Sequence, residues 1–279
     1  MSCTALSAAA GIPLAGTAKR GERWLLLEHR APWGRDALED SGLDEELAQA
    51  LAESGRNVLL VRRPGRPHGQ PVAFAARTEE EGGTLVRLEV ERLQDVLELD
   101  PDRDGVPVAG PLVLVCTHAR RDVCCATHGV PAYNALRRHV PDGMLWRSSH
   151  QGGHRFAANV LALPDGIQLG RVAPAEAAEV AAALADGRIP LRFYRGRTVH
   201  RREVQAADAA VRTALGLDRL EDVRLLEHDA SRVVLATPRG TVEVSVAERE
   251  GPALPASCGK AAEPTPVLEA TVLGLAAAS

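Results

Sequence analysis

Two cysteines and two histidines form the most chemically distinctive pattern in this sequence of 279 residues. Cys116 and Cys125 are separated by eight residues, and His150 and His154 bracket the tripeptide Gln-Gly-Gly. Thiolates and imidazoles are ligands that zinc and iron–sulfur clusters commonly take in proteins. The segment 111–171, which contains all four residues, holds three of the five cysteines and five of the nine histidines. We therefore expect a metal or iron–sulfur site in this segment.

The spacing of these residues argues against the common zinc sites. Zinc fingers place their paired cysteines ~2–4 residues apart, which is much closer than Cys116 and Cys125. A His-x-x-x-His pair on a helix is typical of zinc proteases, but here two glycines occupy its centre. Gln151 also stands where such a protease has its catalytic glutamate. The two glycines instead suit a loop whose backbone approaches a cluster closely and leaves its N–H groups free to donate.

Two cysteines and two histidines can hold a 2Fe–2S cluster. In Rieske centres, two histidines replace two cysteines on one iron and raise the reduction potential. Imidazoles also titrate near neutral pH, so electron transfer could be coupled to proton transfer. The Rieske motif itself, with one Cys and one His in each of two loops, is absent from this sequence. Residue chemistry leaves two alternatives open, namely a structural zinc module and a thiol–disulfide oxidoreductase that uses Cys124 and Cys125.

Several other residues near the four are rival ligands. Cys124 competes with its neighbour Cys125, and the spacing of eight residues from Cys116 favours Cys125. His118 and His128 lie close in sequence and are interpreted as residues that contact the ligands or face solvent. The two cysteines that lie far away in sequence are interpreted as ordinary thiols, Cys3 and Cys258.

The elements that must position these residues alternate between strands and helices. Apolar runs predict strands at 112–115 and 144–148 and a hairpin of 156–163 and 167–172, whose turn is Pro-Asp-Gly. Helices are predicted at 131–140, with Pro131 at the start, and at 173–186. This is the order of a thioredoxin-like domain, which we assign to residues 106–198.

The flanking regions have their own patterns. An irregular segment over 1–22 precedes predicted strands at 24–29, 57–62, 71–77 and 84–91, with helical spacing inside 36–54. After residue 199 we predict a helix at 204–215, strands at 223–227, 231–236 and 241–247, a loop over 254–266, and a strand or helix at 267–275. The expected fold class is α/β: a thioredoxin-like ferredoxin domain with an α/β N-terminal region (1–105) and a small α+β C-terminal region (199–279).

Composition limits the classes of partner. A net charge of −4 gives no general argument for binding nucleic acid or an anionic membrane. No apolar run approaches the ~18 residues of a membrane span. Five cysteines fit poorly with a secreted disulfide framework, so we expect a cytoplasmic protein. Six arginines against two aspartates within 116–155 could attract an acidic redox partner, although solvated surface arginines explain them equally well; no oligomeric state is indicated.

The segments CTHARRDVCC (116–125) and WRSSHQGGHRFAANVLALPDGIQLGRV (146–172) resemble the sucrase/ferredoxin-like family, a branch of the thioredoxin-like 2Fe–2S ferredoxins. Its pattern, C-x8-C followed by H-x-G-G-H, is matched at every position by Cys116, Cys125, His150 and His154. Shorter stretches extend the resemblance, namely PLAGTA (13–18), WLLLE with PWG (24–34) and VQAAD (204–208).

The resemblance implies an electron carrier with one 2Fe–2S cluster, rather than an enzyme with its own substrate. It places Cys116 and Cys125 on one iron and His150 and His154 on the other. It also implies a redox partner protein, either a reductase or an acceptor. No convincing pair of catalytic carboxylates supports the sucrase part of the family name.

Overall fold

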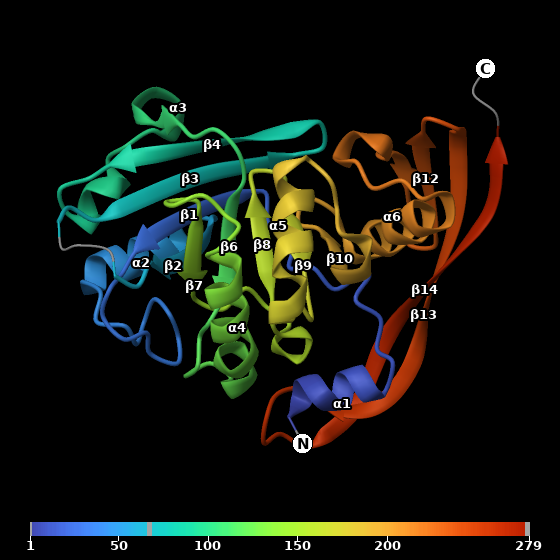
Figure 1. The fold of residues 1–279 in the computed structure, drawn as a ribbon, viewed down its shortest axis with the longest axis horizontal. Helices are drawn as coiled ribbons and strands as arrows, with labels where there is room; N and C mark the ends of the chain where they lie inside the picture. The colour runs from blue at the N-terminus through green and yellow to red at the C-terminus, as the bar shows by residue number, and fades with distance from the viewer. Residues whose placement is uncertain (1, 66–68, 277–279) are drawn as a thin grey trace.

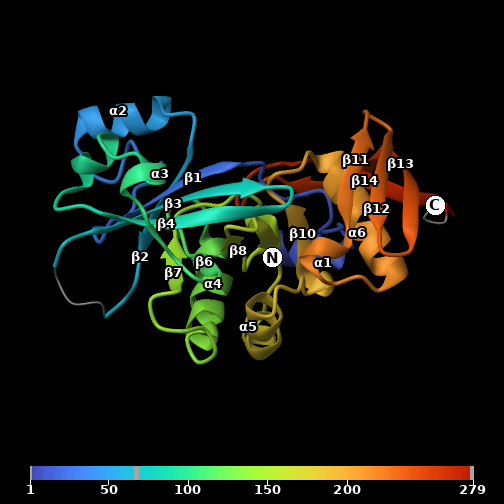
Figure 2. The same ribbon diagram turned by 90° about the horizontal axis from the view of Figure 1, so that it is seen from above.

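The computed structural model describes residues 2–65 and 69–276. Two sheets lie side by side in it, a large curled sheet and a smaller one (Figures 1 and 2). The large sheet has the order β10-β9-β8-β6-β7-β2-β1-β3-β4-β5. Its strands are β1 (Arg23–Glu28), β2 (Asn57–Arg62), β3 (Val72–Glu79), β4 (Gly82–Glu89), β5 (Val106–Pro107), β6 (Leu112–Cys116), β7 (Leu145–Ser148), β8 (Val160–Leu163), β9 (Ile167–Leu169) and β10 (Tyr194–Arg197).

The middle of the large sheet has a thioredoxin-like arrangement. Strands β6 and β7 run parallel, β8 is antiparallel to β6, and β9 is antiparallel to β8. Helix α4 (Val123–Leu136) connects β6 to β7, and helix α5 (Ala177–Ala185) follows β9. The order β9-β8-β6-β7 with these two helices confirms the α/β fold class and the thioredoxin-like domain that the sequence predicted.

Both faces of these central strands are buried, which explains why β6 reads as a continuous apolar run. On one face, Val113 and Val115 pack against Tyr133 of α4 and Val180 of α5. The opposite face contributes Leu114 and other side chains to a core shared with the N-terminal strands, whose largest members are Trp24, Phe74 and Trp146. The curl of the sheet therefore encloses this second core between its two halves.

The N-terminal region continues the same sheet. Strand β2 pairs with β7 through Val61 opposite Ser148 and Arg62 opposite Arg147. Helix α2 (Glu45–Glu53) covers the outer face, where Leu47 and Leu51 pack against β1 and β3, and α3 (Pro101–Asp104) lies near β4. Of the helical spacing predicted within 36–54, only the second half forms a helix. The boundary between residues 105 and 106 stays a prediction.

The smaller sheet belongs to the C-terminal region and has the order β11-β12-β13-β14. Its strands are β11 (Arg224–His228), β12 (Arg232–Thr237), β13 (Gly240–Pro255) and β14 (Ala262–Ala276). Helix α6 (Arg202–Leu215) packs on it through Val204, Ala207 and Val211. None of the helices within the described residues is both long and apolar enough to cross a membrane.

Strands β13 and β14 extend beyond the small sheet as a two-stranded arm. In Figure 1 this red arm descends past α6 and ends beside the N-terminal helix. The loop predicted over 254–266 is therefore wrong, because only 256–261 connect the two strands. Four prolines in or next to this stretch suggested a loop. They are tolerated because each strand of a two-stranded arm has an edge that needs no N–H donor.

Two helix predictions are also corrected. Helix α1 (Cys3–Ala9) forms inside the segment expected to be irregular, and the Ser2 hydroxyl caps it by accepting from the Ala5 N–H. Helix α4 begins at Val123 and not near Pro131, because the Asp122 carboxylate caps it by accepting from the Cys124 N–H. Pro131 is accommodated inside the helix. Cys124 and Cys125 therefore lie in a helical turn and not in a loop.

Candidate metal centre

The two predicted cysteine ligands come from adjacent elements of the thioredoxin-like domain. Cys116 is the last residue of β6 and Cys125 lies in the first turn of α4, and both side chains are buried. The helix approaches the strand closely at Gly129, where an added Cβ would lie 2.0 Å from the Cys116 carbonyl oxygen. Only glycine allows this approach, and it brings the two thiols together.

His150 completes a compact group with these thiols. Its Nδ1 atom lies 3.7 Å from the Cys125 sulfur and 4.0 Å from the Cys116 sulfur. One ligand atom from each of the three residues lies within 4.8 Å of the other two, so the group could hold a metal ion. His150 is the second residue after β7, whose parallel pairing with β6 brings the end of β7 next to Cys116.

His154 lies beside this group and presents a free nitrogen. Its ring centroid is 5.5 Å from that of His150. Its Nε2 atom lies 2.5 Å from the carbonyl oxygen of Ala256, whereas its buried Nδ1 atom has no hydrogen-bond partner among the described residues. Histidines that bind metals are commonly held in this way, with one ring nitrogen donating to a carbonyl and the other left for the metal. The structure does not bring a His154 nitrogen into the compact group of the other three residues, but its unpartnered buried nitrogen, on a ring beside that of His150, fits a metal or cluster ligand.

The loop that carries both histidines is fixed by buried polar side chains. Gln151 donates to the carbonyl of Leu114 in β6, and Asn159 donates to the carbonyl of Gly153. The guanidinium of Arg195, from β10, donates to the Gly152 carbonyl at 3.2 Å and to the Asn159 side chain at 2.8 Å. These bonds hold the loop against β6 and β10 and so set the direction of the two imidazoles.

Gly153 shows why this loop needs its second glycine. Its φ angle of +68° lies in the left-handed region, which other residues adopt at a cost. An added Cβ would also lie 2.3 Å from a guanidinium nitrogen of Arg195. The sequence led us to expect glycines that bring the backbone close to a cluster. The structure instead explains Gly153 by its backbone conformation and by the space that Arg195 occupies.

The electrostatics of the site favour a thiolate. A hydrogen bond from Cys125 lowers the pKa of Cys116 well below its usual range, with a further contribution from His150. The same hydrogen bond, together with burial, raises the pKa of Cys125. Burial lowers the pKa of Arg195 to about 9, and the negative charge of Cys116 partly offsets that effect. No pattern in the sequence marks Arg195, which lies far from the ligand motif in the chain.

The remaining histidines of the segment lie outside the group. His118 is buried, its Nε2 atom lies 2.6 Å from the Gly34 carbonyl oxygen, and its ring meets Trp33 edge-on. Burial lowers the pKa of His118. His128 is half-buried on α4, and His139 is exposed just after that helix. His118 is thus a packed residue that joins the connection between β6 and α4 to the PWG segment and does not face solvent.

The two cysteines in tandem face different groups. The Cys125 sulfur lies near His150, whereas the Cys124 sulfur lies 3.4 Å from that of Cys3 and 3.3 Å from that of Cys258. The structure therefore places Cys125 with the predicted ligands and Cys124 with the two distant cysteines. The sequence treated Cys3 and Cys258 as ordinary thiols, and no local pattern around either one indicates that they meet.

The outer segments of the family resemblance also meet in space. Thr17 accepts from the Arg195 guanidinium, and Ala18 exchanges backbone hydrogen bonds with the side-chain amide of Gln205. Asp208 accepts a 2.7 Å hydrogen bond from the Tyr194 hydroxyl. Hydrogen bonds from the PLAGTA and VQAAD segments therefore hold β10, the strand that carries Arg195, in place.

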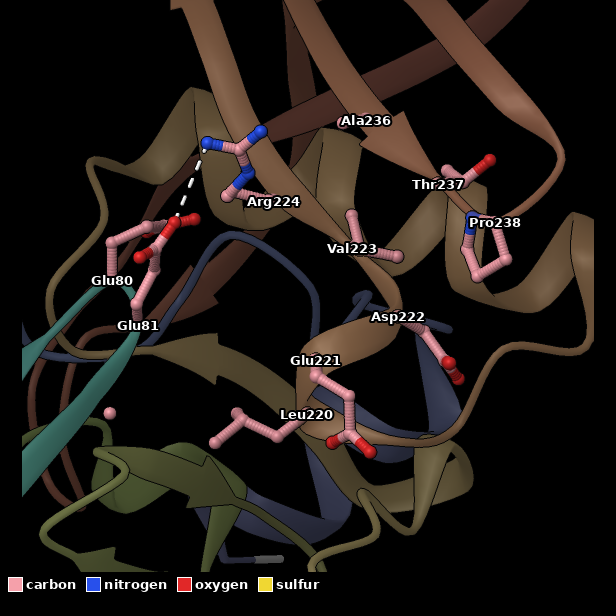
Figure 3. A pocket seen from close by; sticks show the side chains of 11 residues that line it. Glu80, Glu81, Leu220, Glu221, Asp222, Val223, Arg224, Ala236, Thr237 and Pro238 are labelled. Carbon is pink, nitrogen blue, oxygen red and sulfur yellow. Dashed lines mark hydrogen bonds and ion pairs between the residues drawn. The ribbon is translucent and has the colours of Figure 1, made fainter. Parts of the chain in front are cut away.

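A cavity of about 520 Å³ lies away from this centre, between the β3–β4 turn and the C-terminal region (Figure 3). Four acidic residues line it together with apolar ones, and the Arg224 guanidinium lies 3.4 Å from a carboxylate oxygen of Glu81. No cysteine or histidine lines it. It therefore contributes nothing to the candidate metal centre.

Comparison with known families finds one match that covers more than half of the chain. Residues 14–196 match the family described as Sucrase/ferredoxin-like. This range includes all four predicted ligands and the Arg195 side chain that supports their loop.

Individual relatives are more distant. The curated protein "Altered inheritance of mitochondria protein 32" from Meyerozyma guilliermondii is 31% identical over 98 residues, which are 31% of this chain and 34% of that protein. The chain thus covers about a third of this relative. A thioredoxin-like [2Fe-2S] ferredoxin from Aquifex aeolicus matches with 17% identity over 31% of this chain and 91% of the ferredoxin, at a TM-score of 0.27. A serine variant of the same ferredoxin matches at a TM-score of 0.26 with 17% identity, over 30% of this chain and 96% of that one.

Proposed function

The chain belongs to the sucrase/ferredoxin-like family, and from this premise we propose that it is an electron-transfer protein with one 2Fe–2S cluster. The proposed ligands are the four residues of the motif, Cys116, Cys125, His150 and His154. The cluster would accept and release one electron at a time. An electron carrier of this kind needs no substrate pocket of its own.

The observation that carries the proposal is the compact group of Cys116, Cys125 and His150, beside which the ring of His154 lies. The Nδ1 atom of His150 lies within 4.0 Å of both sulfurs, and the buried Nδ1 atom of His154 has no partner within the described part of the chain. Two thiolates and two imidazoles are the donor set that a mixed Cys/His cluster requires. A single zinc ion could use the same donors, so metal analysis must separate the two.

Each surrounding residue has a part in this function. The Ala256 carbonyl fixes the ring of His154 through its Nε2–H, which leaves Nδ1 available as a ligand. Arg195 supplies a buried positive charge that opposes the negative charge of the thiolates and of an added electron. Burial of Cys116 and Cys125 excludes water from the sulfur side of the site.

We also propose a redox partner protein with an acidic surface. Arg120 and Arg121 are exposed on the loop between Cys116 and the start of α4, next to the proposed ligands. Positive charge at that position would attract a negatively charged partner and speed its association. All five cysteines are free, which suits a reducing compartment, and we propose the cytoplasm.

Anaerobic purification tests the cluster. We expect a red-brown protein with two iron and two sulfide per chain, whose visible absorption bleaches with dithionite. Cys116→Ser should lose the colour. Cys124→Ser removes the thiol of the residue next to Cys125 in the chain and should keep the colour. A colourless protein whose only metal is zinc bound at the same four residues would contradict the proposal.

The histidine ligands need a separate readout, namely the reduction potential. His154→Cys should retain a cluster, because a thiolate can replace the imidazole, but its added negative charge should lower the potential by roughly 100 mV or more. His128→Cys, at a half-buried position of α4 outside the group, is the matched control and should leave the potential unchanged. An unchanged potential in the His154 variant would mean that His154 is not a ligand.

A further inference from the structure

A second group of thiols lies next to the proposed cluster site. The sulfur of Cys124 is 3.4 Å from that of Cys3 and 3.3 Å from that of Cys258, and the sulfurs of Cys3 and Cys258 are 3.5 Å apart. The carboxylate of Asp122 completes the group, and one ligand atom from each of the four residues lies within 4.8 Å of the others. This group shares no residue with the group of Cys116, Cys125 and His150.

The three thiols come from parts of the chain that are remote in sequence. Cys3 is in α1, Cys124 is in the first turn of α4, and Cys258 is in the 256–261 connection at the tip of the β13–β14 arm. Figure 1 shows α1 and this tip lying together at the lower edge of the molecule. Neutral thiols form only weak hydrogen bonds with one another, so hydrogen bonding alone gives little reason for three of them to converge.

We propose that Cys3, Cys124 and Cys258 bind one zinc ion, with Asp122 as the fourth ligand. Structural zinc sites in proteins are tetrahedral and closed, and cysteine thiolates dominate them. Zinc with Zn–S bonds of ~2.3 Å sets its sulfurs ~3.8 Å apart, which is a few tenths of an ångström wider than the triangle here. The three sulfurs are therefore already placed for a common metal ion.

The carboxylate distinguishes zinc from the main alternatives. Cu(I) is also bound by three thiolates, but a carboxylate oxygen is a hard ligand that does not suit it. A disulfide requires two sulfurs at ~2.05 Å and leaves the third thiol and the carboxylate unused. Asp122 is buried and faces the thiols, which favours a closed site for a divalent ion.

The surroundings of Asp122 hold the site in place. One carboxylate oxygen accepts from the Cys124 N–H at 2.8 Å and the other accepts from the Cys258 N–H at 3.1 Å. These bonds orient the carboxylate and attach the arm tip to the start of α4, as supporting hydrogen bonds do at metal sites. Cys258 is only half-buried, so an ion can enter from the arm side.

The zinc site would also support the neighbouring histidine. The second oxygen of Asp122 lies 3.7 Å from Nε2 of His154, and Ala256, two residues before Cys258, provides the carbonyl that this nitrogen contacts. An ion that fixes Cys258 therefore fixes the Ala256 carbonyl against His154. The inference that zinc binds here does not rest on the identity of the cluster.

Metal analysis of the full chain and of two variants tests the inference. Wild-type protein grown with zinc should contain one zinc per chain in addition to iron. Cys258→Ser should lose at least nine-tenths of the zinc and keep its iron, whereas Cys116→Ser should lose iron and keep the zinc. Zinc that is lost from Cys116→Ser but kept in Cys258→Ser would overturn the inference.

A measurement on wild-type protein keeps the test decisive if a variant fails to fold. Native mass spectrometry should give the mass of the chain with one zinc, and alkylation after denaturation with a chelator should label all five cysteines. Absence of zinc, copper in its place, or only three alkylated cysteines would each overturn the zinc site. Wild-type protein that contains zinc but no iron would contradict the proposed cluster and would still support the zinc site.

Discussion

Cys124 and Cys125 are neighbours in the chain, yet their thiols contact different groups. Successive residues in an α-helix point ~100° apart, so two adjacent side chains in the first turn of α4 cannot face the same point. The Cys125 sulfur turns to His150, and the Cys124 sulfur turns to Cys3 and Cys258. One turn of helix thus serves two candidate metal sites, and Asp122 caps that turn while it takes part in the second site.

At the residue scale, Arg195 should tune the reduction potential. Its guanidinium is buried, interacts electrostatically with Cys116 and has no carboxylate partner among the described residues, so it should stabilise an added electron. Arg195→Met should lower the midpoint potential by on the order of tens of millivolts, whereas Arg195→Lys, which keeps the charge, should lower it much less. Redox titration followed by visible absorption measures both. Equal potentials in the Met variant and the wild type would exclude this role.

The four motif residues could be predicted from sequence because their types and spacing are local signals. Cys116 and Cys125 are separated by a fixed number of residues, and His150 and His154 surround a recognisable pair of glycines. Cys3 and Cys258 could not be predicted, because they meet only through tertiary structure. Their separation in the chain is 255 residues, and no pairwise pattern of a single sequence reports such a contact.

At the element scale, the ligand loop depends on how its backbone fits around Arg195. Strand β6 and helix α4 supply the thiols, and the loop after β7 supplies the imidazoles. Polar contacts from Gln151, Asn159 and Arg195 hold the loop in its conformation. A residue that displaces Arg195 should therefore disturb both histidines.

Gly153→Ala tests this requirement against a matched glycine. Gly153 has φ of +68° and Gly187 has φ of +67°, but an added Cβ meets Arg195 only at Gly153 and finds nothing within 4 Å at Gly187. Both alanine variants carry the left-handed penalty of ~1–2 kcal/mol. Gly153→Ala should lose at least ~1 kcal/mol more in the free energy of unfolding, because of the clash. Urea unfolding measures the difference, and equal losses would contradict the packing argument.

The elements themselves were predictable where hydrophobic patterning is strong. The apolar runs of β1, β2 and β6 identified those strands within about a residue, and the β8–β9 hairpin was marked by its Pro-Asp-Gly turn. The start of α4 was missed, because Pro131 resembles a first helical residue while the true start depends on the Asp122 cap. The outer part of the arm was missed, because the prolines in and next to residues 254–266 resemble a loop, although the two strands pair there.

At the scale of the whole molecule, the two ends of the chain converge on the thioredoxin-like domain. Helix α1 at one end and the tip of the β13–β14 arm at the other flank the start of α4 (Figure 1). Farther along, helix α6 joins the small sheet to β10 of the large sheet. The predicted region 199–279 therefore contacts the ligand domain at two separate places, through its arm and through α6.

One buried ion pair lies at the contact between α6 and the large sheet. The Asp208 carboxylate accepts from the Arg212 guanidinium at 2.9 Å and from the Tyr194 hydroxyl of β10 at 2.7 Å, and both charged side chains are at most 3% exposed. Arg212 also donates to the carbonyls of Arg219 and Leu220, which lie ahead of the small sheet. Removal of Asp208 would leave a buried guanidinium without its counter-charge.

Asp208→Ala should therefore lower the free energy of unfolding by ~3–5 kcal/mol, as expected when one member of a buried pair is removed. Glu269→Ala is the control, because its pair with Arg249 on the arm is exposed on both sides and should change stability little. Urea unfolding of the two variants beside wild type measures the effect. A small loss in the Asp208 variant would mean that apolar packing of α6, and not the ion pair, joins the small sheet to the rest of the molecule.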